Sequence, residues 1–408
     1  MSTDPALAAA PAAFDEQPHE YDAILLLGFG GPEGQDDVIP FLRNVTRGRG
    51  IPDERLEEVA HHYRHFGGVS PINRQNHELR DALAAELDRR GIDLPVLWGN
   101  RNWDPTLPDA LREAEAHGFR RILALATSAY ASYSGCKQYQ ENIDDALAET
   151  GLAGRLTIDK ARPYFDHPGF IAPFVEALRG GIAELREKIP GLDPAQDVRI
   201  LFATHSVPNS YTGDFGPHPE ALGGAGAPAD TVARSGVPGA AAGIGAYEAQ
   251  HLAVSAAVAE AAGEGAAWDL VYQSRSGPAH QPWLEPDIND FIAEIPKGSA
   301  KAIVIVPVGF VSDHMEVLWD LDTEAIETAG EHGLEVVRVP TPGTHPAYVS
   351  GLIDLVLERR DGTPVAERAS ELALGPWFDV CGEGCCDTEE RQAAVRAHRA
   401  RAMQAADA

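Results

Sequence analysis

Short apolar runs of strand length recur along the chain, and each is followed by a turn-rich segment and then a helical pattern. Because the runs are apolar on both faces, they are typical of parallel strands that are covered by helices on each side. Ligands of such sheets bind beyond the carboxyl ends of the strands, so the loops that follow the runs are expected to carry function. The runs span residues 24–27, 96–98, 122–126, 198–203, 270–272, 303–308 and 336–339.

A segment with two prolines, Pro163 and Pro168, divides these runs into two sets and indicates a domain boundary. A chain of 408 residues is long enough for two domains of ordinary size. We therefore predict an α/β protein with two domains, each a parallel sheet flanked by helices, over residues 21–160 and 161–360. Residues 1–20 are expected to form a disordered tail, 213–245 a flexible Gly- and Ala-rich insertion, and 361–408 a C-terminal extension.

The charge of the chain excludes one class of partner. A formal net charge of −29 at pH 7 disfavours nucleic acid, because phosphate binding requires a basic surface. No apolar run approaches the roughly 20 residues that span a bilayer, so we expect no integral membrane contact. The first 20 residues lack the cationic region of an export signal, which predicts a cytoplasmic protein.

The sequence Gly28-Phe29-Gly30-Gly31-Pro32 follows the first apolar run. Glycines in this position can bring the backbone close to a dinucleotide phosphate, but the third glycine of the GxGxxG fingerprint is missing. We therefore interpret the segment as a tight turn beside a ligand.

Three carboxylates, Glu316, Asp320 and Glu324, follow the run 303–308 at intervals of four residues. On an α-helix they would share one face, where like charges cost roughly a few tenths of a kcal/mol per pair. A bound cation would offset that repulsion; a solvated acidic face is the ordinary alternative. His205 lies at the end of the run 198–203, and its imidazole can bind a metal or accept a proton near neutral pH. His205 and Glu316 are therefore predicted to act together.

The chain has four cysteines, and three of them crowd a short C-terminal stretch. In a reducing compartment this pattern favours metal ligation over disulfides. Structural zinc and a redox disulfide are the alternatives at this point. The four are Cys136, Cys381, Cys385 and Cys386.

From about residue 23 to residue 358 the sequence resembles the ferrochelatase family. The most specific motif is Pro-Val-Gly-Phe-Val-Ser-Asp-His-Met-Glu-Val-Leu-Trp-Asp-Leu-Asp at 307–322. The other matching motifs are Leu-Gly-Phe-Gly-Gly-Pro (27–32), Tyr-Arg-His-Phe-Gly-Gly-Val-Ser-Pro-Ile (63–72), Thr-His-Ser-Val-Pro (204–208), Tyr-Gln-Ser-Arg-Ser-Gly-Pro (272–278) and Pro-Trp-Leu-Glu-Pro-Asp (282–287).

The resemblance implies a lyase that inserts Fe²⁺, its substrate, into a porphyrin held in a cleft between two Rossmann-like domains. His205 and Glu316 would be the catalytic residues on opposite walls and would bind the iron. Asp320 and Glu324 would relay metal or protons from the surface. The porphyrin would be held by Ser70, Tyr139, Tyr63, Arg47, Phe29 and Trp283.

The segment 44–58 is short and charged where animal ferrochelatases carry an apolar lip. This difference favours coproporphyrin III, which has four propionates, as in the enzymes of Gram-positive actinobacteria. Arg47, Arg49, Tyr63 and Arg64 are candidates to contact the propionates. The alternatives are protoporphyrin IX as substrate, a sirohydrochlorin or cobalt chelatase, and a non-enzymatic haem-binding protein.

The sequence also departs from the family pattern. Phe29 stands where Gram-positive relatives have a tyrosine that ligates product iron, and His62 and Thr46 replace arginines near the propionates. The four cysteines resemble the ligands of cluster-bearing ferrochelatases, so the resemblance implies a [2Fe–2S] cluster, although the spacing Cys381-x-x-x-Cys385-Cys386 differs from that of animal enzymes. We expect a monomer, with haem-pathway enzymes as partners.

Overall fold

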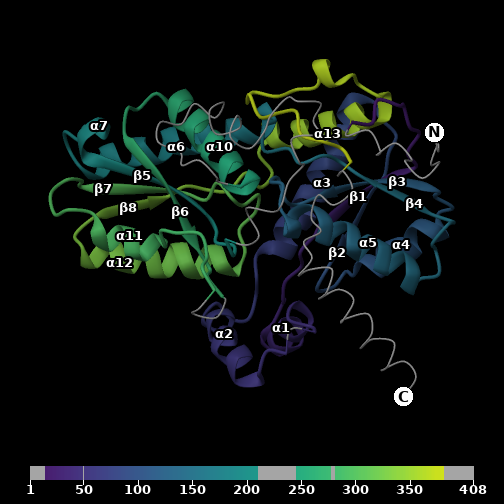
Figure 1. Ribbon diagram of the computed structural model, residues 1–408, viewed down its shortest axis with the longest axis horizontal. Helices are drawn as coiled ribbons and strands as arrows, with labels where there is room; N and C mark the ends of the chain where they lie inside the picture. Colours follow the sequence, from purple (N-terminus) through teal and green to yellow (C-terminus); the bar gives the residue numbers. More distant parts are fainter. Residues whose placement is uncertain (1–13, 49, 210–244, 277–280, 381–408) are drawn as a thin grey trace, which may run out of the picture.

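Two parallel sheets form the framework of the computed structural model, which describes residues 14–48, 50–209, 245–276 and 281–380. The first sheet has the strand order β2-β1-β3-β4 and the second β6-β5-β7-β8, so the two halves repeat one topology (Figure 1). The prediction of two parallel sheets is confirmed. The strands are β1 (Ala23–Gly28), β2 (Val96–Asn100), β3 (Arg121–Ala126), β4 (Thr157–Lys160), β5 (Val198–His205), β6 (Ala267–Gln273), β7 (Ala302–Val306) and β8 (Glu335–Arg338).

Strand β4 is the element that the apolar pattern did not reveal. It lies at the edge of the first sheet, where it pairs only with β3, and two of its four residues are the half-buried Asp159 and Lys160. Asp159 forms an ion pair with Arg121 at 2.7 Å and accepts a hydrogen bond from Tyr21 at 2.9 Å. Because an edge strand is covered less than a central one, it can carry polar residues and gives a weaker apolar signal.

One continuous apolar core runs through both halves. Ile24 and Leu26 of the first sheet and Ile200 and Phe202 of the second contribute to the same buried cluster. The intervening residues of each strand point to separate cores on the outer faces of the two sheets. This alternation is the period-two geometry of a strand that is buried on both sides.

Helices cover both faces of each sheet (Figure 1). Helix α13 contacts both α6 and α3, so the chain returns after the second sheet to pack on the first half. The described helices are α1 (Val38–Val45), α2 (Asp53–His65), α3 (Ile72–Arg90), α4 (Leu107–Ala116), α5 (Gln138–Glu149), α6 (Pro168–Lys188), α7 (Pro194–Asp197), α10 (Ala246–Ala262), α11 (Ile288–Glu294), α12 (Ile326–Glu331) and α13 (Pro346–Asp361). Shorter or wider turns are η1 (Gln35–Asp37), η2 (Tyr133–Lys137), η4 (Val317–Ala325) and η5 (Val365–Glu367).

Helices α1 and α2 form a small lobe that projects from the rest of the molecule (Figure 1). The two helices pack against each other around Phe41 and Leu56. Within the described ranges, no helix combines the length and the apolar character required to cross a membrane.

Residues 14–20 differ from the disordered tail that we predicted for 1–20. Asp15 forms an ion pair with Arg359 of α13 at 2.6 Å, and its amide donates to Asp379 at 3.0 Å. The backbone amide of His19 donates to Arg360 at 2.9 Å. Asp15, one of the acidic residues that suggested a solvated tail, thus pairs with an arginine of the C-terminal half. Residues 1–13, the predicted insertion up to 244, and residues 381–408 lie outside the described residues.

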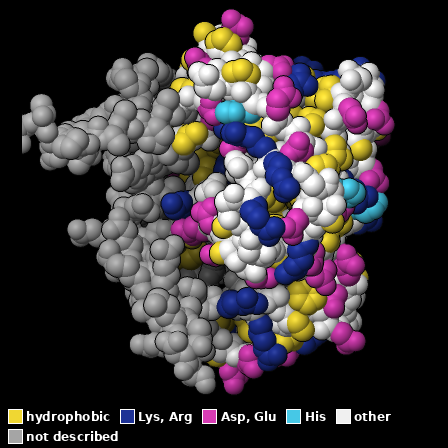
Figure 2. All heavy atoms as spheres, turned by 90° about the vertical axis from the view of Figure 1, so that its right-hand side faces the viewer, with side chains coloured by type: hydrophobic (Ala, Val, Ile, Leu, Met, Phe, Trp, Pro, Cys, Tyr) yellow, Lys and Arg dark blue, Asp and Glu magenta, His cyan; other side chains and the backbone are white. Residues whose placement is uncertain are grey.

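The surface is rich in charge, but its exposed ion pairs each contribute little to the free energy of unfolding. On the face formed by the first half, Lys and Arg side chains are interspersed with Asp and Glu (Figure 2). Ion pairs of this half such as Arg112–Asp109 and Arg155–Glu115 are about half exposed, and pairs of this kind typically contribute 0 to about 1 kcal/mol.

A buried ion pair joins the segment before α6 to α13. The side chain of Arg162 is 1% exposed and lies 2.8 Å from Asp166 and 2.9 Å from Glu358. Replacing Arg162 with Met would leave two buried carboxylates without their cation, so we expect the free energy of unfolding to fall by about 3–5 kcal/mol. Urea denaturation measures this loss. The exposed Arg155→Met variant is the matched control, with an expected loss below about 1 kcal/mol; equal losses in the two variants would contradict the prediction.

Candidate active site

His205 and Glu316 face each other at the carboxyl edge of the second sheet. His205 is the last residue of β5, and Glu316 immediately precedes η4. His205 Nε2 lies 3.7 Å from Glu316 Oε2, with the side chains 33% and 48% exposed. His205 Nδ1 also bonds to the carbonyl of Ser206. The two residues that the sequence placed at separate strand ends are therefore brought together.

Each member of this pair shifts the pKa of the other. Burial acts to lower the pKa of His205, but the Glu316 carboxylate more than offsets it and raises the pKa to about 9. Burial acts to raise the pKa of Glu316, whereas His205 lowers it further, to about 2. At neutral pH the pair is thus an imidazolium and a carboxylate, still open to solvent.

Segment η4 is a π-helix rather than the α-helix assumed from the spacing of the carboxylates. Its wider turn changes the direction of successive side chains, and such segments occur often at functional sites. Asp320 accepts hydrogen bonds from Ser274 Oγ and, at 3.3 Å, from Gln273 Nε2. Glu324 instead accepts from Trp319 Nε1 at 2.8 Å. The predicted row of three carboxylates is thus divided between different partners.

Asp320 is the carboxylate that lies next to the His205–Glu316 pair. Burial and the neighbouring Glu316 raise the pKa of Asp320 to about 7, against the hydrogen bond from Ser274. Ser274 has a φ of +62°, a conformation that costs a non-glycine residue of the order of 1–3 kcal/mol. The local structure therefore maintains a strained residue in contact with Asp320.

The four predicted metal residues have different hydrogen-bond partners. Ser274 and Gln273 bond to Asp320, whereas Trp319 bonds to Glu324. Among the residues that the structure describes, no group of three or more His, Cys, Asp or Glu side chains is arranged to hold a metal ion. Binding of iron by His205, Glu316, Asp320 and Glu324 stays a prediction.

Phe29 and Tyr139 lie on the first half, joined by a residue that the sequence did not single out. The guanidinium carbon of Arg101 lies 4.5 Å from the centre of the Tyr139 ring and 5.6 Å from that of Phe29. Arg101 Nε donates to Asn142 at 2.7 Å. Tyr139 is buried beneath it, and Phe29 is partly exposed. Sequence reasoning could have found Arg101 by its position in the loop directly after β2.

Tyr63, Arg47 and Trp283 occupy different surroundings. Burial, together with Glu316 and Asp320, raises the pKa of Tyr63, so the charges of these two carboxylates act on this phenol. Arg47 is exposed and donates to Asn44. Trp283 is buried, and its Nε1 has no hydrogen-bond partner among the described residues.

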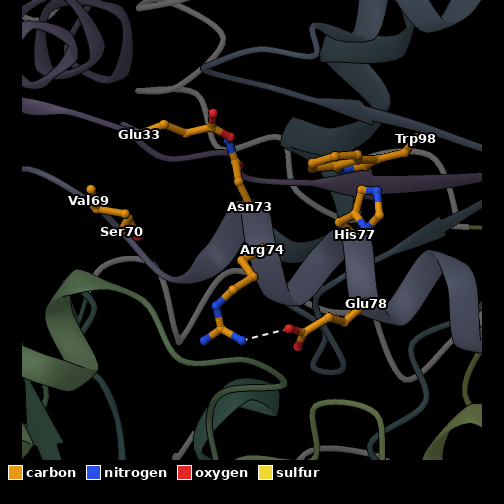
Figure 3. A pocket seen from close by; sticks show the side chains of 8 residues that line it. All are labelled: Glu33, Val69, Ser70, Asn73, Arg74, His77, Glu78 and Trp98. Atoms are coloured by element: carbon orange, nitrogen blue, oxygen red, sulfur yellow. Dashed lines mark hydrogen bonds and ion pairs between the residues drawn. The ribbon is translucent and has the colours of Figure 1, made fainter.

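Ser70 lies in a pocket of about 460 Å³ along α3. Its amide donates to Pro32 at 2.9 Å, and its side chain is at one end of the pocket (Figure 3). The pocket includes neither His205 nor Glu316. Its lining residues are Glu33, Val69, Ser70, Asn73, Arg74, His77, Glu78 and Trp98.

Helix α2 of the small lobe contacts the second half through Trp319. The Trp319 ring stacks on His62 with 4.1 Å between centroids and 6° between planes, and His61 and His65 approach it edge-on. His62, which replaces an arginine of some relatives, therefore packs on an indole ring.

Cys136 is the one cysteine that lies within the described residues. It is buried in η2, another π-helical segment. Cys381, Cys385 and Cys386 lie outside the described residues. Of the four predicted thiolate ligands, the structure therefore describes Cys136 alone.

Comparison with known proteins shows the family of the chain. The family model described as ferrochelatase matches residues 21–360. The chain is 64% identical over 381 residues to the coproporphyrin III ferrochelatase of Leifsonia xyli, covering 93% of this chain and 94% of the relative. It is 49% identical to the protein of that name in Tropheryma whipplei, over 93% and 92% of the two chains, and 50% identical to that of Streptomyces coelicolor, over 92% and 95%. The chain belongs to the ferrochelatase family.

Proposed function

We propose that this protein inserts Fe²⁺ into coproporphyrin III and thereby acts as a lyase of haem biosynthesis. The observation that carries the proposal is the pair of His205 and Glu316, with Nε2 and Oε2 3.7 Å apart at the carboxyl edge of the second sheet. The relatives of up to 64% identity that bear the name coproporphyrin III ferrochelatase support the choice of substrate.

The reaction requires both a base and a ligand that releases iron. Two pyrrole N–H protons must leave as Fe²⁺ enters the ring, so that the macrocycle becomes a dianion that binds the metal. A neutral imidazole accepts such a proton, and a carboxylate releases bound Fe²⁺ more readily than a thiolate does. His205 supplies the first group and Glu316 the second.

The ion pair couples these two roles. In the absence of iron, Glu316 keeps His205 protonated because it raises the pKa of the imidazole to about 9. When the Glu316 carboxylate binds Fe²⁺, its negative charge no longer favours the imidazolium, so the proton leaves His205. The imidazole is then free to take one pyrrole proton, release it to solvent through its exposed side, and take the second in the same way. Arrival of the metal therefore activates the base.

Asp320 and Glu324 extend the negative potential away from this pair. Asp320 raises the local negative charge once it is ionised above its pKa of about 7. Glu324 is held on the exposed side by Trp319. We propose that both carboxylates attract the cation toward Glu316, as electrostatic guidance rather than as permanent ligands.

The first half supplies the surface for the porphyrin. Arg101, between Tyr139 and Phe29, carries a positive charge that a propionate would pair with. We propose that Ser70, Tyr63, Arg47 and Trp283 also contact the porphyrin. The small lobe carries exposed charges, such as the pair of Arg43 in α1 and Asp53 in α2 at 2.9 Å, and a tetra-anionic, water-soluble porphyrin suits such a border. Placement of the protein in the cytoplasm is likewise a proposal, which cell fractionation checks.

Anaerobic Fe²⁺ insertion into coproporphyrin III and into protoporphyrin IX tests the substrate. We expect kcat/KM to be at least tenfold higher for coproporphyrin III, because its two additional propionates gain charge-assisted contacts. Absorbance of the metallated product measures both rates under the same conditions. A preference for protoporphyrin IX would refute this assignment and favour the alternative that the protein is a protoporphyrin IX ferrochelatase.

Substitution of His205 tests the mechanism. His205→Ala removes the base, so we expect kcat for iron insertion to fall by a factor of about 10²–10⁴, while porphyrin binding, followed by fluorescence, stays within twofold. His117→Ala is the matched control, because His117 ends α4 on the surface of the first half. Turnover by the His205→Ala protein at the wild-type rate would overturn the mechanism.

We further propose that the four cysteines hold a [2Fe–2S] cluster. The described chain ends at Val380, next to Cys381, and the segment before it is anchored by Trp377, whose ring centroid lies 5.6 Å from that of Phe165. Phe165 in turn stacks on Tyr130 at 6.0 Å, and the Tyr130 carbonyl adjoins Gly135, the neighbour of Cys136. These contacts link the last described segment, which ends next to Cys381, to the turn that holds Cys136. Such a cluster supplies one-electron chemistry or structural support.

Iron and acid-labile sulfide in anaerobically purified protein test the cluster. We expect about two of each per chain, with visible absorbance that Cys136→Ser abolishes, because the cluster needs four thiolates. Colourless protein that contains zinc would show a structural zinc site in its place. The readout is independent of iron insertion into the porphyrin.

A further inference from the structure

Polar side chains are buried directly behind His205, where β5 meets α10. Thr204 is fully buried, and its Oγ1 lies 2.9 Å from Tyr247 Oη and 2.9 Å from His251 Nε2. Tyr247 Oη lies 3.0 Å from the backbone carbonyl of His205. None of these three side chains is among the residues to which the proposed function gives a role.

The directions of these hydrogen bonds follow from counting hydrogens. His251 Nδ1 lies 2.7 Å from the Tyr247 carbonyl, which only accepts, so Nδ1 carries the ring hydrogen. Burial lowers the pKa of His251 to about 3, so the ring carries no second hydrogen at neutral pH. Nε2 is therefore an acceptor, and the Thr204 hydroxyl donates to it.

Tyr247 then has one hydroxyl hydrogen and two neighbouring acceptors. Thr204 has already given its hydrogen to His251, so four contacts share three hydrogens. The carbonyl of His205 is a stronger acceptor than a hydroxyl oxygen, and Tyr247 donates to it. The contact between Thr204 Oγ1 and Tyr247 Oη therefore has no hydrogen of its own and is the weak one.

We propose that Thr204, Tyr247 and His251 are positioning residues for His205. His251 takes the hydrogen of Thr204, which leaves the Tyr247 hydroxyl to hold the His205 carbonyl and so to set the direction of the imidazole toward Glu316. The inference rests on the role proposed above for His205.

The same network reaches the other wall of the site and the first half of the chain. The His251 ring stacks on Tyr130, with 3.6 Å between centroids and 13° between planes, and Tyr130 Oη donates to Val308 at 3.0 Å. A Cβ at Gly309 would lie 2.2 Å from Thr204 Oγ1, so glycine there permits the close approach of the loop that leads to Glu316. The network thus links His205, the Glu316 loop and the half that holds the porphyrin.

The test compares variants of the full-length protein in anaerobic iron insertion. For Tyr247→Phe we expect a roughly tenfold lower kcat, with the Kd for coproporphyrin III within twofold of wild type, because only the orientation of the His205 imidazole changes. Tyr348→Phe is the matched control: it also removes a buried hydroxyl, which bonds to Tyr164 at 3.1 Å, and should keep kcat within twofold.

A second pair of variants keeps the test decisive where Tyr247→Phe folds poorly. His251→Gln can still donate to the Tyr247 carbonyl and accept from Thr204, and should keep more than half of the wild-type kcat. His251→Leu cannot, and should lose about as much kcat as Tyr247→Phe.

The outcomes separate this inference from the proposed function. Equal kcat in Tyr247→Phe and Tyr348→Phe, or in His251→Gln and His251→Leu, would overturn the positioning role while the role of His205 stands. Undiminished turnover by His205→Ala would instead overturn the proposed mechanism, whatever the other variants do.

Discussion

The packing of both sheets against one apolar core determines where the chemistry of this protein takes place. Residues such as Leu26 and Phe202, one from each sheet, belong to the same buried cluster. Phe165, Phe170 and Phe174, in and before α6, fill the cluster at the junction of the two halves. The loops at the carboxyl edges of the sheets are consequently held by one packed core, as the proposed site with members from both halves requires.

Much of this framework could be predicted from the sequence because central strands are apolar on both faces. His205 and Glu316 could be located because His205 ends β5, Glu316 lies in the segment that leads from β7 to η4, and both belong to family motifs. Strand β4 escaped detection because an edge strand may be half polar. Residues 14–20 escaped because acidic residues indicate a solvated tail unless their arginine partners, such as Arg359, are known to be near.

Other features depend on contacts between distant segments that no local pattern encodes. The π-helical turn of η4 divides the carboxylates, and an interpretation based on a period of 3.6 residues could not place Glu324 on Trp319. The stacking of His62 on Trp319 joins residues about 250 positions apart through the meeting of the small lobe with the second half. Arg101 was visible as a strand-end residue, but its position over Tyr139 required the tertiary structure.

Under the proposed mechanism, the arrangement of charges suits a metal that passes through the site. Glu316 is neutralised in part by His205, whereas Asp320 is kept near its midpoint of ionisation at neutral pH by burial and by Glu316. A cation that approaches Glu316 relieves the repulsion between these carboxylates, and in doing so it removes the charge that keeps His205 protonated. A resident metal would call for three or more converging ligands, which would hold iron against the porphyrin. In the proposed mechanism the partly exposed Glu316 is the ligand and His205 is the base, so the macrocycle can take the metal from this site.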